Sequence, residues 1–203
     1  MKSTIGFVMT AALAIFVIGC EQQTTNVDIT HDEGKAVLSL DYRDFDQAAS
    51  KMLQSMFASG ALKKPGGGRY VVATSRITND TMQRIDIDQL MAKIEQELLN
   101  SGQVVMTSAV GAQSSVDPLV QEARKLRDNE EFDPNKIAAK KTLIPPELSI
   151  SGKILQRNIP YQRGTQQVEY YFELKVADLK SGLRLWQNET LIGKRGSSKS
   201  VAW

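Results

Sequence analysis

Cysteine and histidine are almost missing from this 203-residue chain, which has one of each. Because Cys20 has no second thiol to pair with, the chain can form no internal disulfide. His31, the single histidine, lies in a polar segment with no helical or strand periodicity. These absences argue against a Ser-His-Asp triad, a histidine general base and a histidine-rich zinc site. We therefore expect neither a metal nor a cofactor.

The chain also lacks an excess of charge of either sign, since 25 basic side chains balance 23 acidic ones. A nucleic-acid partner would require a clustered basic surface. The near balance of charge therefore argues against such a partner.

Arrangements of carboxylates and glycines that support catalysis are equally scarce. Glu169 and Glu173 would share one side of a strand, where they could do acid–base work, but the solvated side of an amphipathic strand has the same pattern. The glycine-rich stretch Lys63–Arg69 lacks the G-K-[ST] ending of a phosphate loop. The three aspartates within residues 41–46 fit the first turn of a helix better than a calcium site. We find no general acid for a hydrolase and predict that the protein is not an enzyme.

The N-terminal residues 1–19 have the pattern of a secretory signal peptide. Lys2 precedes an apolar run, Ile5–Ile18, that is short for a membrane span, which disfavours an uncleaved membrane helix. The run closes on Val17-Ile18-Gly19-Cys20, an arrangement that bacterial lipoprotein processing accepts. We predict that Cys20 becomes the lipidated first residue of the mature chain.

Residues 20–36 are predicted to be a lipidated flexible tether, because they hold few apolar residues and no sustained period. Such a tether reaches roughly 50 Å when fully extended. Glu21 follows the lipidated cysteine, in place of the aspartate that retains lipoproteins in the inner membrane. This favours a protein anchored in the outer membrane, with its domain facing the periplasm.

Residues 37–193 are predicted to form one globular domain, followed by a basic tail over residues 194–203. A polar connection over residues 77–81 and a mobile loop over residues 157–166 would interrupt the regular elements. The periodicity predicts helices over residues 41–59, 87–98 and 117–128, and strands over residues 70–74, 103–107, 148–154, 168–176 and 183–191. This order predicts an α+β fold with a mixed four- to five-stranded sheet, helices packed on one face and a C-terminal antiparallel meander.

Three stretches of this domain, taken together and in this order, resemble one known family. They are residues 41–53, the strand–N-x-T–helix element of residues 70–102, and the D-L-K-S-G hairpin of residues 174–186. Behind the cysteine motif and the tether, they resemble the penicillin-binding protein activator (LpoB) family of outer-membrane lipoproteins, over roughly residues 37–193. The second and third stretches also resemble the TolB N-terminal domain and the curli secretion lipoprotein, and the helix before the first strand favours the activators.

The resemblance implies a non-enzymatic regulator that docks on a bifunctional penicillin-binding protein and stimulates peptidoglycan synthesis. The tether is shorter and less proline-rich than in the best-known member, so the partner's docking site would lie nearer the outer membrane or the spacing would be smaller. The alternative is a structural lipoprotein of an envelope machine, such as a flagellar or secretion assembly, with the same fold. The family's docking residues do not map onto a motif here.

Arginine is the residue type that we select for the docking surface, because it is enriched at interfaces and pairs well with carboxylates. Arginines expected near the sheet edge and its loops are Arg76, Arg84, Arg157 and Arg163. An ordinary solvated surface would have the same composition.

Overall fold

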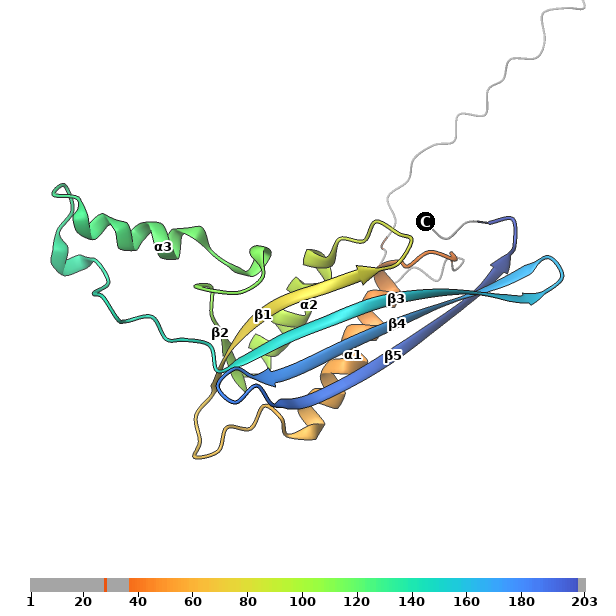
Figure 1. The fold of residues 1–203 in the computed structure, drawn as a ribbon, viewed down its shortest axis with the longest axis horizontal. Helices are drawn as coiled ribbons and strands as arrows, with labels where there is room; N and C mark the ends of the chain where they lie inside the picture. The colour runs from red at the N-terminus through yellow and green to blue at the C-terminus, as the bar shows by residue number, and fades with distance from the viewer. Residues whose placement is uncertain (1–27, 29–36, 201–203) are drawn as a thin grey trace, which may run out of the picture. The chain divides into compact units, whose positions relative to one another are not determined.

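The computed structural model describes residue 28 and residues 37–200, and every described helix and strand belongs to one compact unit, Gly34–Trp203 (Figure 1). The predicted signal peptide, Cys20 and the predicted tether lie outside the described residues, apart from Asp28. Among the residues that the structure describes, no helix is both long enough and apolar enough to cross a membrane.

A five-stranded mixed sheet forms the centre of the domain, in the order β2-β1-β3-β4-β5. Its strands are β1 (Tyr70–Asp80), β2 (Val104–Met106), β3 (Leu148–Gln162), β4 (Thr165–Asp178) and β5 (Arg184–Ser197). β1 is parallel to both β2 and β3, whereas β3, β4 and β5 form an antiparallel meander. The α+β fold with a mixed sheet and a C-terminal meander is therefore confirmed.

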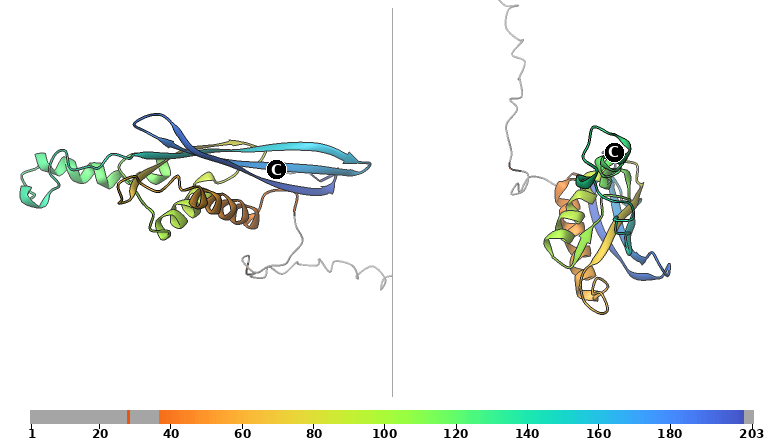
Figure 2. Two further views of the ribbon diagram at one scale, coloured as in Figure 1. Left: turned by 90° about the horizontal axis from the view of Figure 1, so that it is seen from below. Right: turned by 90° about the vertical axis from the view of Figure 1, so that its left-hand side faces the viewer.

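Two helices, α1 (Tyr42–Ser59) and α2 (Ile87–Asn100), cover one face of the sheet (Figure 2). Asp41 caps α1 by accepting hydrogen bonds from the first-turn backbone N–H groups, and the Asp44 side chain accepts from the N–H of Asp41 in return. Gly60 ends α1 in the left-handed region, at φ 75°, which glycine adopts without strain. The capping signals in the sequence therefore set both ends of α1.

The core lies between these helices and the sheet face that they cover. Alternate residues of β4 from Val168 to Val176 are almost completely buried, as the period-two pattern predicts. Phe172 of β4 meets Phe45 of α1 edge to face, with ring centroids 5.9 Å apart. No helix among residues 37–200 lies over the opposite face of the sheet, so the other residues of β4 are only partly buried.

β1 is longer than the sequence predicts, because it continues through a β-bulge to Asp80. Thr74 is paired with Ile150 of β3, and Ile77 with Gly152, so β1 holds one extra residue there. The polar connection predicted at residues 77–81 is therefore wrong. Residues 78–80 are polar and exposed, and they lie in the strand along one edge, where polar side chains are tolerated.

The mobile loop predicted over residues 157–166 is also wrong. β3 and β4 continue through it as a hairpin that turns at Arg163 and Gly164. Pro160 argues against a strand in the sequence, but β3 has no neighbour on its β1 side beyond Leu155, and proline is allowed at such an edge. β5 likewise runs to Ser197, so residues 194–197 of the predicted tail lie in the strand.

The segment between β2 and β3 carries α3 (Pro118–Lys125) and three 3-10 turns, Gln113–Ser115, Leu126–Asp128 and Pro134–Lys136. The helix predicted over residues 117–128 is confirmed, with its last turn as a 3-10 helix. None of the residues of α3 is buried, and the helix stands apart from the sheet (Figure 1). It therefore adds nothing to the domain core.

Candidate functional site

The four arginines that the sequence selects all lie on the surface. Arg76 is in the bulge of β1, Arg84 is in the loop between β1 and α2, Arg157 is in β3, and Arg163 is at the turn between β3 and β4. None of them forms an ion pair with a described residue. Their guanidinium groups therefore remain available to a partner.

The structure brings three of these arginines toward one part of the sheet and places the fourth elsewhere. Arg157 and Arg163 share the far half of the β3–β4 hairpin. The loop that carries Arg84 contacts the same hairpin, since the backbone N–H of Met82 donates to Oε1 of Gln156 at 3.2 Å. Arg76 lines a separate cavity, together with Ile87 and Asp88 of α2.

The sheet face opposite the helices presents rows of side chains that are fixed by strand register. Tyr171 pairs with Leu155 of β3 and Leu191 of β5, and the next row on the same face holds Arg157, Glu169 and Gly193. The row beyond holds Ile159, Gln167 and Arg195. We use the name distal face for six residues of this region: Arg157, Ile159, Tyr161, Tyr171, Leu191 and Arg195.

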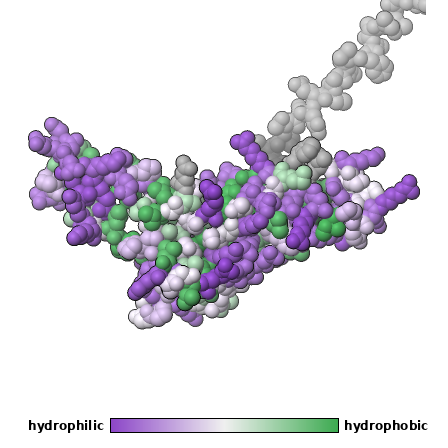
Figure 3. Space-filling view, in the orientation of Figure 1, coloured by the Kyte–Doolittle hydropathy of each residue, from purple (hydrophilic) through white to green (hydrophobic). Residues whose placement is uncertain are grey.

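Exposed apolar and cationic groups are mixed on the distal face. Ile159, Tyr161 and Leu191 are 36%, 48% and 51% exposed. Figure 3 looks onto the uncovered side of the sheet and shows hydrophobic residues set among hydrophilic ones over β3–β5. Such mixing of anchors and charges is typical of transient protein interfaces.

Two arginines of the distal face are held against tyrosine rings. Cζ of Arg157 lies 5.3 Å from the centroid of the Tyr171 ring, and Cζ of Arg195 lies 4.0 Å from that of Tyr161. Nε of Arg195 also donates to Oε1 of Gln167 at 2.7 Å. Because the guanidinium groups are positioned in advance, a partner that binds them has less side-chain entropy to remove.

Glu169 lies between the two arginine–tyrosine pairs. It is suited to hold neighbouring side chains in place and not to donate a proton. It accepts hydrogen bonds from the Tyr171 hydroxyl and from Nε2 of Gln167, both at 2.6 Å. Both bonds lower the pKa of the Glu169 carboxyl, and the bond from Tyr171 has the larger effect. The bond between Tyr171 and Glu169 also raises the pKa of Tyr171. A general acid needs a raised pKa. The second carboxylate considered for acid–base work, Glu173, forms an ion pair with Lys175 at 2.5 Å.

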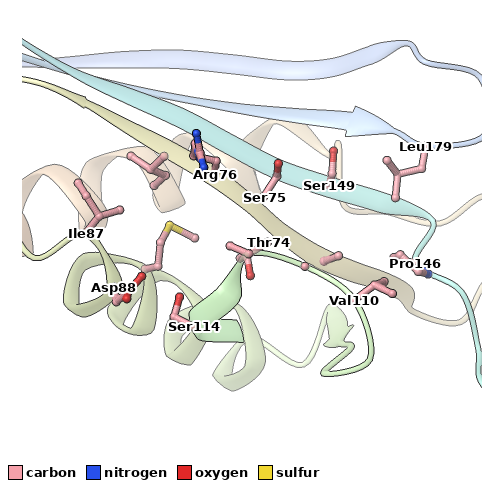
Figure 4. A pocket seen from close by; sticks show the side chains of 15 residues that line it. Thr74, Ser75, Arg76, Ile87, Asp88, Val110, Ser114, Pro146, Ser149 and Leu179 are labelled. Carbon is pink, nitrogen blue, oxygen red and sulfur yellow. The ribbon is translucent and has the colours of Figure 1, made fainter. Parts of the chain in front are cut away.

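A cavity of about 680 Å³ lies between β1, the start of α2 and residues 110–114. Figure 4 shows Ser75, Arg76 and Ser149 on the strands, with Ile87 and Asp88 on α2. Its described lining has serine and threonine hydroxyls but no histidine, cysteine or lysine. Among residues 28 and 37–200, no cluster of three histidine, cysteine, aspartate or glutamate side chains could hold a metal ion.

Beside this cavity, Thr74, Ser115 and Glu95 form a closed polar cluster. The hydroxyls of Thr74 and Ser115 both donate to Oε1 of Glu95 at 2.6 Å. The backbone N–H of Ala112 also donates to the carbonyl of Thr74 at 2.7 Å. These bonds fasten the segment after β2 to β1 and α2, so the cluster holds the fold together at the cavity wall.

Sequence reasoning missed Tyr161, Tyr171 and Arg195 as candidate site residues. Tyr161 lies within the segment predicted to be a loop, and Arg195 within the predicted tail. A usable signal was present, because Arg157, Ile159 and Tyr161 alternate with polar residues and proline at the period of a strand. The R-G dipeptide that follows marks the hairpin turn.

Comparison with known proteins places the chain in one family. A model of the family described as "Peptidoglycan-synthase activator LpoB" matches residues 44–192. The C-terminal domain of LpoB from Salmonella enterica is 11% identical, with a TM-score of 0.42, and the match covers 73% of this chain and 98% of that one. The corresponding domain from Escherichia coli is 10% identical, with the same TM-score and the same shares.

A further solved structure, lipoprotein GNA1162 from Neisseria meningitidis, is 10% identical with a TM-score of 0.33, over 65% of this chain and 86% of that one. A search of curated proteins finds no match. The family match spans well over half of the chain and includes all but the ends of the described helices and sheet. The chain therefore belongs to the peptidoglycan-synthase activator LpoB family.

Proposed function

We propose that this protein is an outer-membrane lipoprotein that binds a bifunctional penicillin-binding protein and activates it. Membership of a family of peptidoglycan-synthase activators supports the regulatory role. The motif that ends at Cys20, followed by Glu21, supports lipidation and sorting to the outer membrane. The domain acts by binding, because an activator needs a docking surface and no catalytic group of its own.

The distal face is the observation that carries this proposal. It is a sheet face without a covering helix, and it presents two arginines that are stacked on tyrosines beside exposed Ile159 and Leu191. Tyrosine and arginine dominate the binding energy of many interfaces when they surround apolar anchors. The distal face therefore fits a protein partner better than a small ligand.

The charge of this region specifies the partner's chemistry. Between Leu155 and Tyr171 the chain carries two arginines and one acid, Glu169, and between Thr190 and Lys199 it carries only cations. One of those cations, Lys194, is neutralised by Asp44 on the covered side of the sheet. The distal face therefore fits a synthase surface with exposed carboxylates around an apolar patch.

Activation follows if the protein binds the productive conformation of the synthase more tightly than the resting one. A ligand shifts an equilibrium only by the difference in its affinity for the two states. The pairing of β3–β5 sets the arrangement of side chains on the distal face, and a preorganised surface can favour one conformation of its partner.

The test uses the full lipidated chain in detergent micelles with purified bifunctional penicillin-binding proteins. Binding and the rate of glycan polymerisation are measured for the wild type and for the double variant Arg157→Glu/Arg195→Glu. We expect at least about tenfold weaker binding and loss of stimulation, because charge reversal repels the acidic partner surface. The matched control is Arg69→Glu, an exposed arginine in the loop before β1, which leaves both unchanged.

Absence of binding and stimulation for the wild type with every bifunctional penicillin-binding protein of the source bacterium would contradict the proposal. Recovery of flagellar or secretion components from envelope extracts, without any penicillin-binding protein, would favour a structural lipoprotein. Equal binding by the wild type and the double variant would leave the activator role standing and remove the distal face from it.

A further inference from the structure

The residues that lead into α1 are pinned to the covered face of the sheet by side chains. The hydroxyl of Tyr170 in β4 donates to the carbonyl oxygen of Leu38 at 2.8 Å. Nζ of Lys194 in β5 donates to the carbonyl oxygen of Ser39 at 2.8 Å. We call residues Leu38–Leu40 the strap, because they lie across these strands before the chain enters the helix.

A third contact holds the strap from the loop between β1 and α2. The backbone N–H of Leu40 donates to Oε1 of Gln83 at 3.0 Å. Nε2 of the same amide donates to the hydroxyl oxygen of Tyr170. Gln83 thus links the strap to Tyr170, and both ends of its amide are used.

These sheet groups are buried, and each has one hydrogen-bond acceptor in the strap. Tyr170 is fully buried, and the Lys194 side chain is 8% exposed. Lys194 also forms an ion pair with Asp44, and its Nζ lies 3.7 Å from Asp41, next to the strap. A buried hydroxyl or ammonium that loses a partner carries a desolvation penalty, so the strap is held firmly while the domain is folded.

Glycine at position 196 of β5 makes room for the strap. A Cβ built on Gly196 would lie 2.9–3.0 Å from three side-chain atoms of Leu38, and no other neighbour is as close. Leu38 is itself 9% exposed and belongs to the core. The close approach of strap and strand therefore requires a residue without a side chain.

The contacts of the strap lie directly behind the distal face. Tyr170 and Lys194 point to the covered side of the sheet, whereas their chain neighbours Tyr171 and Arg195 point to the open side. Any shift of β4 or β5 that follows release of the strap therefore moves two residues of the distal face.

We propose that the strap regulates the distal face: when it is docked, it fixes β4 and β5 in the geometry that binds the synthase, and its release weakens that binding. The proposal rests on the proposed function, because it concerns the affinity of the same surface. Coupling between two sites is reciprocal, so synthase binding also stabilises the docked strap. The strap begins 18 residues after Cys20 in the sequence, so the link to the membrane joins the domain at this element.

Two variants of the full chain release the strap from different sides. Gly196→Ala displaces Leu38 by a steric clash, and Tyr170→Phe removes the hydroxyl that holds the Leu38 carbonyl. Tyr70→Phe is the matched control, because it removes a tyrosine hydroxyl from the start of β1, away from the strap. The measurements are hydrogen exchange at the Leu40 and Arg195 amides and the dissociation constant for the synthase.

We expect both strap variants to speed exchange at Leu40 about tenfold and to weaken synthase binding about fivefold, with no change for Tyr70→Phe. Faster exchange at Leu40 with unchanged synthase binding would overturn the coupling, and unchanged exchange at Leu40 would overturn the strap itself. If the wild type binds no synthase, the proposed function fails. Exchange at the Arg195 amide then tests by itself whether the strap affects the distal face. Unchanged exchange at Arg195 in both strap variants then refutes it, whereas faster exchange supports it.

Discussion

Two adjacent tyrosines of β4 show how differently the two faces of the sheet are used. Tyr170 points to the covered face, where it is fully buried and its hydroxyl contacts Leu38 and Gln83. Tyr171 points to the open face, where its hydroxyl donates to Glu169 and its ring lies beneath Arg157. The same residue type thus contributes to stability at one position and to a binding surface at the next.

The comparison shows that buried residues of the strands contribute to stability, whereas residues on the open face contribute to recognition. Residues on the covered face have partners within the chain, and their loss exposes or empties the core. Residues on the open face have partners that leave part of each side chain in solvent, so their loss affects recognition more than folding. Variants that separate stability from binding can therefore test the division directly.

The largest expected effect is the difference in stability between truncating a side chain on the covered face and truncating one on the open face. Phe172→Ala should lower the free energy of unfolding by about 3–5 kcal/mol, because it empties a core position in contact with Phe45. Tyr171→Ala, one residue earlier, should lower it by less than about 1 kcal/mol. Urea unfolding followed by circular dichroism measures both. Equal losses would show that the open face is covered in the folded protein and would break the comparison.

Adding a single carbon to a strand tests the same division. In Gly152→Ala the new Cβ would lie 2.3 Å from the carbonyl oxygen of Glu173 and 2.8 Å from the Leu174 side chain. We expect a loss of about 2–3 kcal/mol, because strands β3 and β4 must move apart. Gly193→Ala, on the open face with no atom within 4 Å, is the control and should be nearly neutral. Thermal unfolding of both variants is the measurement, and a neutral Gly152→Ala would contradict the register.

The smallest effect concerns the titration of Tyr170. Burial raises the pKa of Tyr170 to about 12, against 10 for an exposed tyrosine. A group with a raised folded-state pKa gives stability that is fully present below pH 10 and is lost as pH rises toward 12, since the unfolded chain releases its proton first. The loss is roughly 2 kcal/mol.

Unfolding in urea at several values between pH 9 and pH 12 measures this slope for the wild type and for Tyr170→Phe. The difference between the two isolates Tyr170 from the lysines that titrate in the same range. An identical slope in both proteins would show that Tyr170 ionises freely. Burial on the covered face would then have no effect on its pKa.

Elements with strong local signals were predictable from the sequence. Asp41 and Gly60 mark the ends of α1, and the alternation from Val168 to Val176 identifies the covered face of β4. The bulge in β1 and the passage of β3 through Pro160 were not predictable, because both depend on where β1 stops pairing with β3. That boundary is a property of the assembled sheet.

The candidate site was only partly predictable for the same reason. Arg157 and Arg163 could be selected by residue type, but their joint position follows from the hairpin register. The strap has no sequence signal, because its contacts join Leu38 to Tyr170 and Ser39 to Lys194 across most of the chain. Contacts of that range appear only once the fold brings the ends of the domain together.

The order of the strands along the chain determines the order in which this domain can assemble. β3, β4 and β5 all lie in the C-terminal part of the chain, whereas β1 must wait for β3, with Val72 pairing to Leu148. Until β3, β4 and β5 have paired, the apolar sides of α1 and α2 have no complete sheet to cover. The meander can form through local hairpins. Closing the long loop to β1 adds an entropy cost that grows only slowly with loop length. The unfolded chain therefore exposes its future core until the meander has formed.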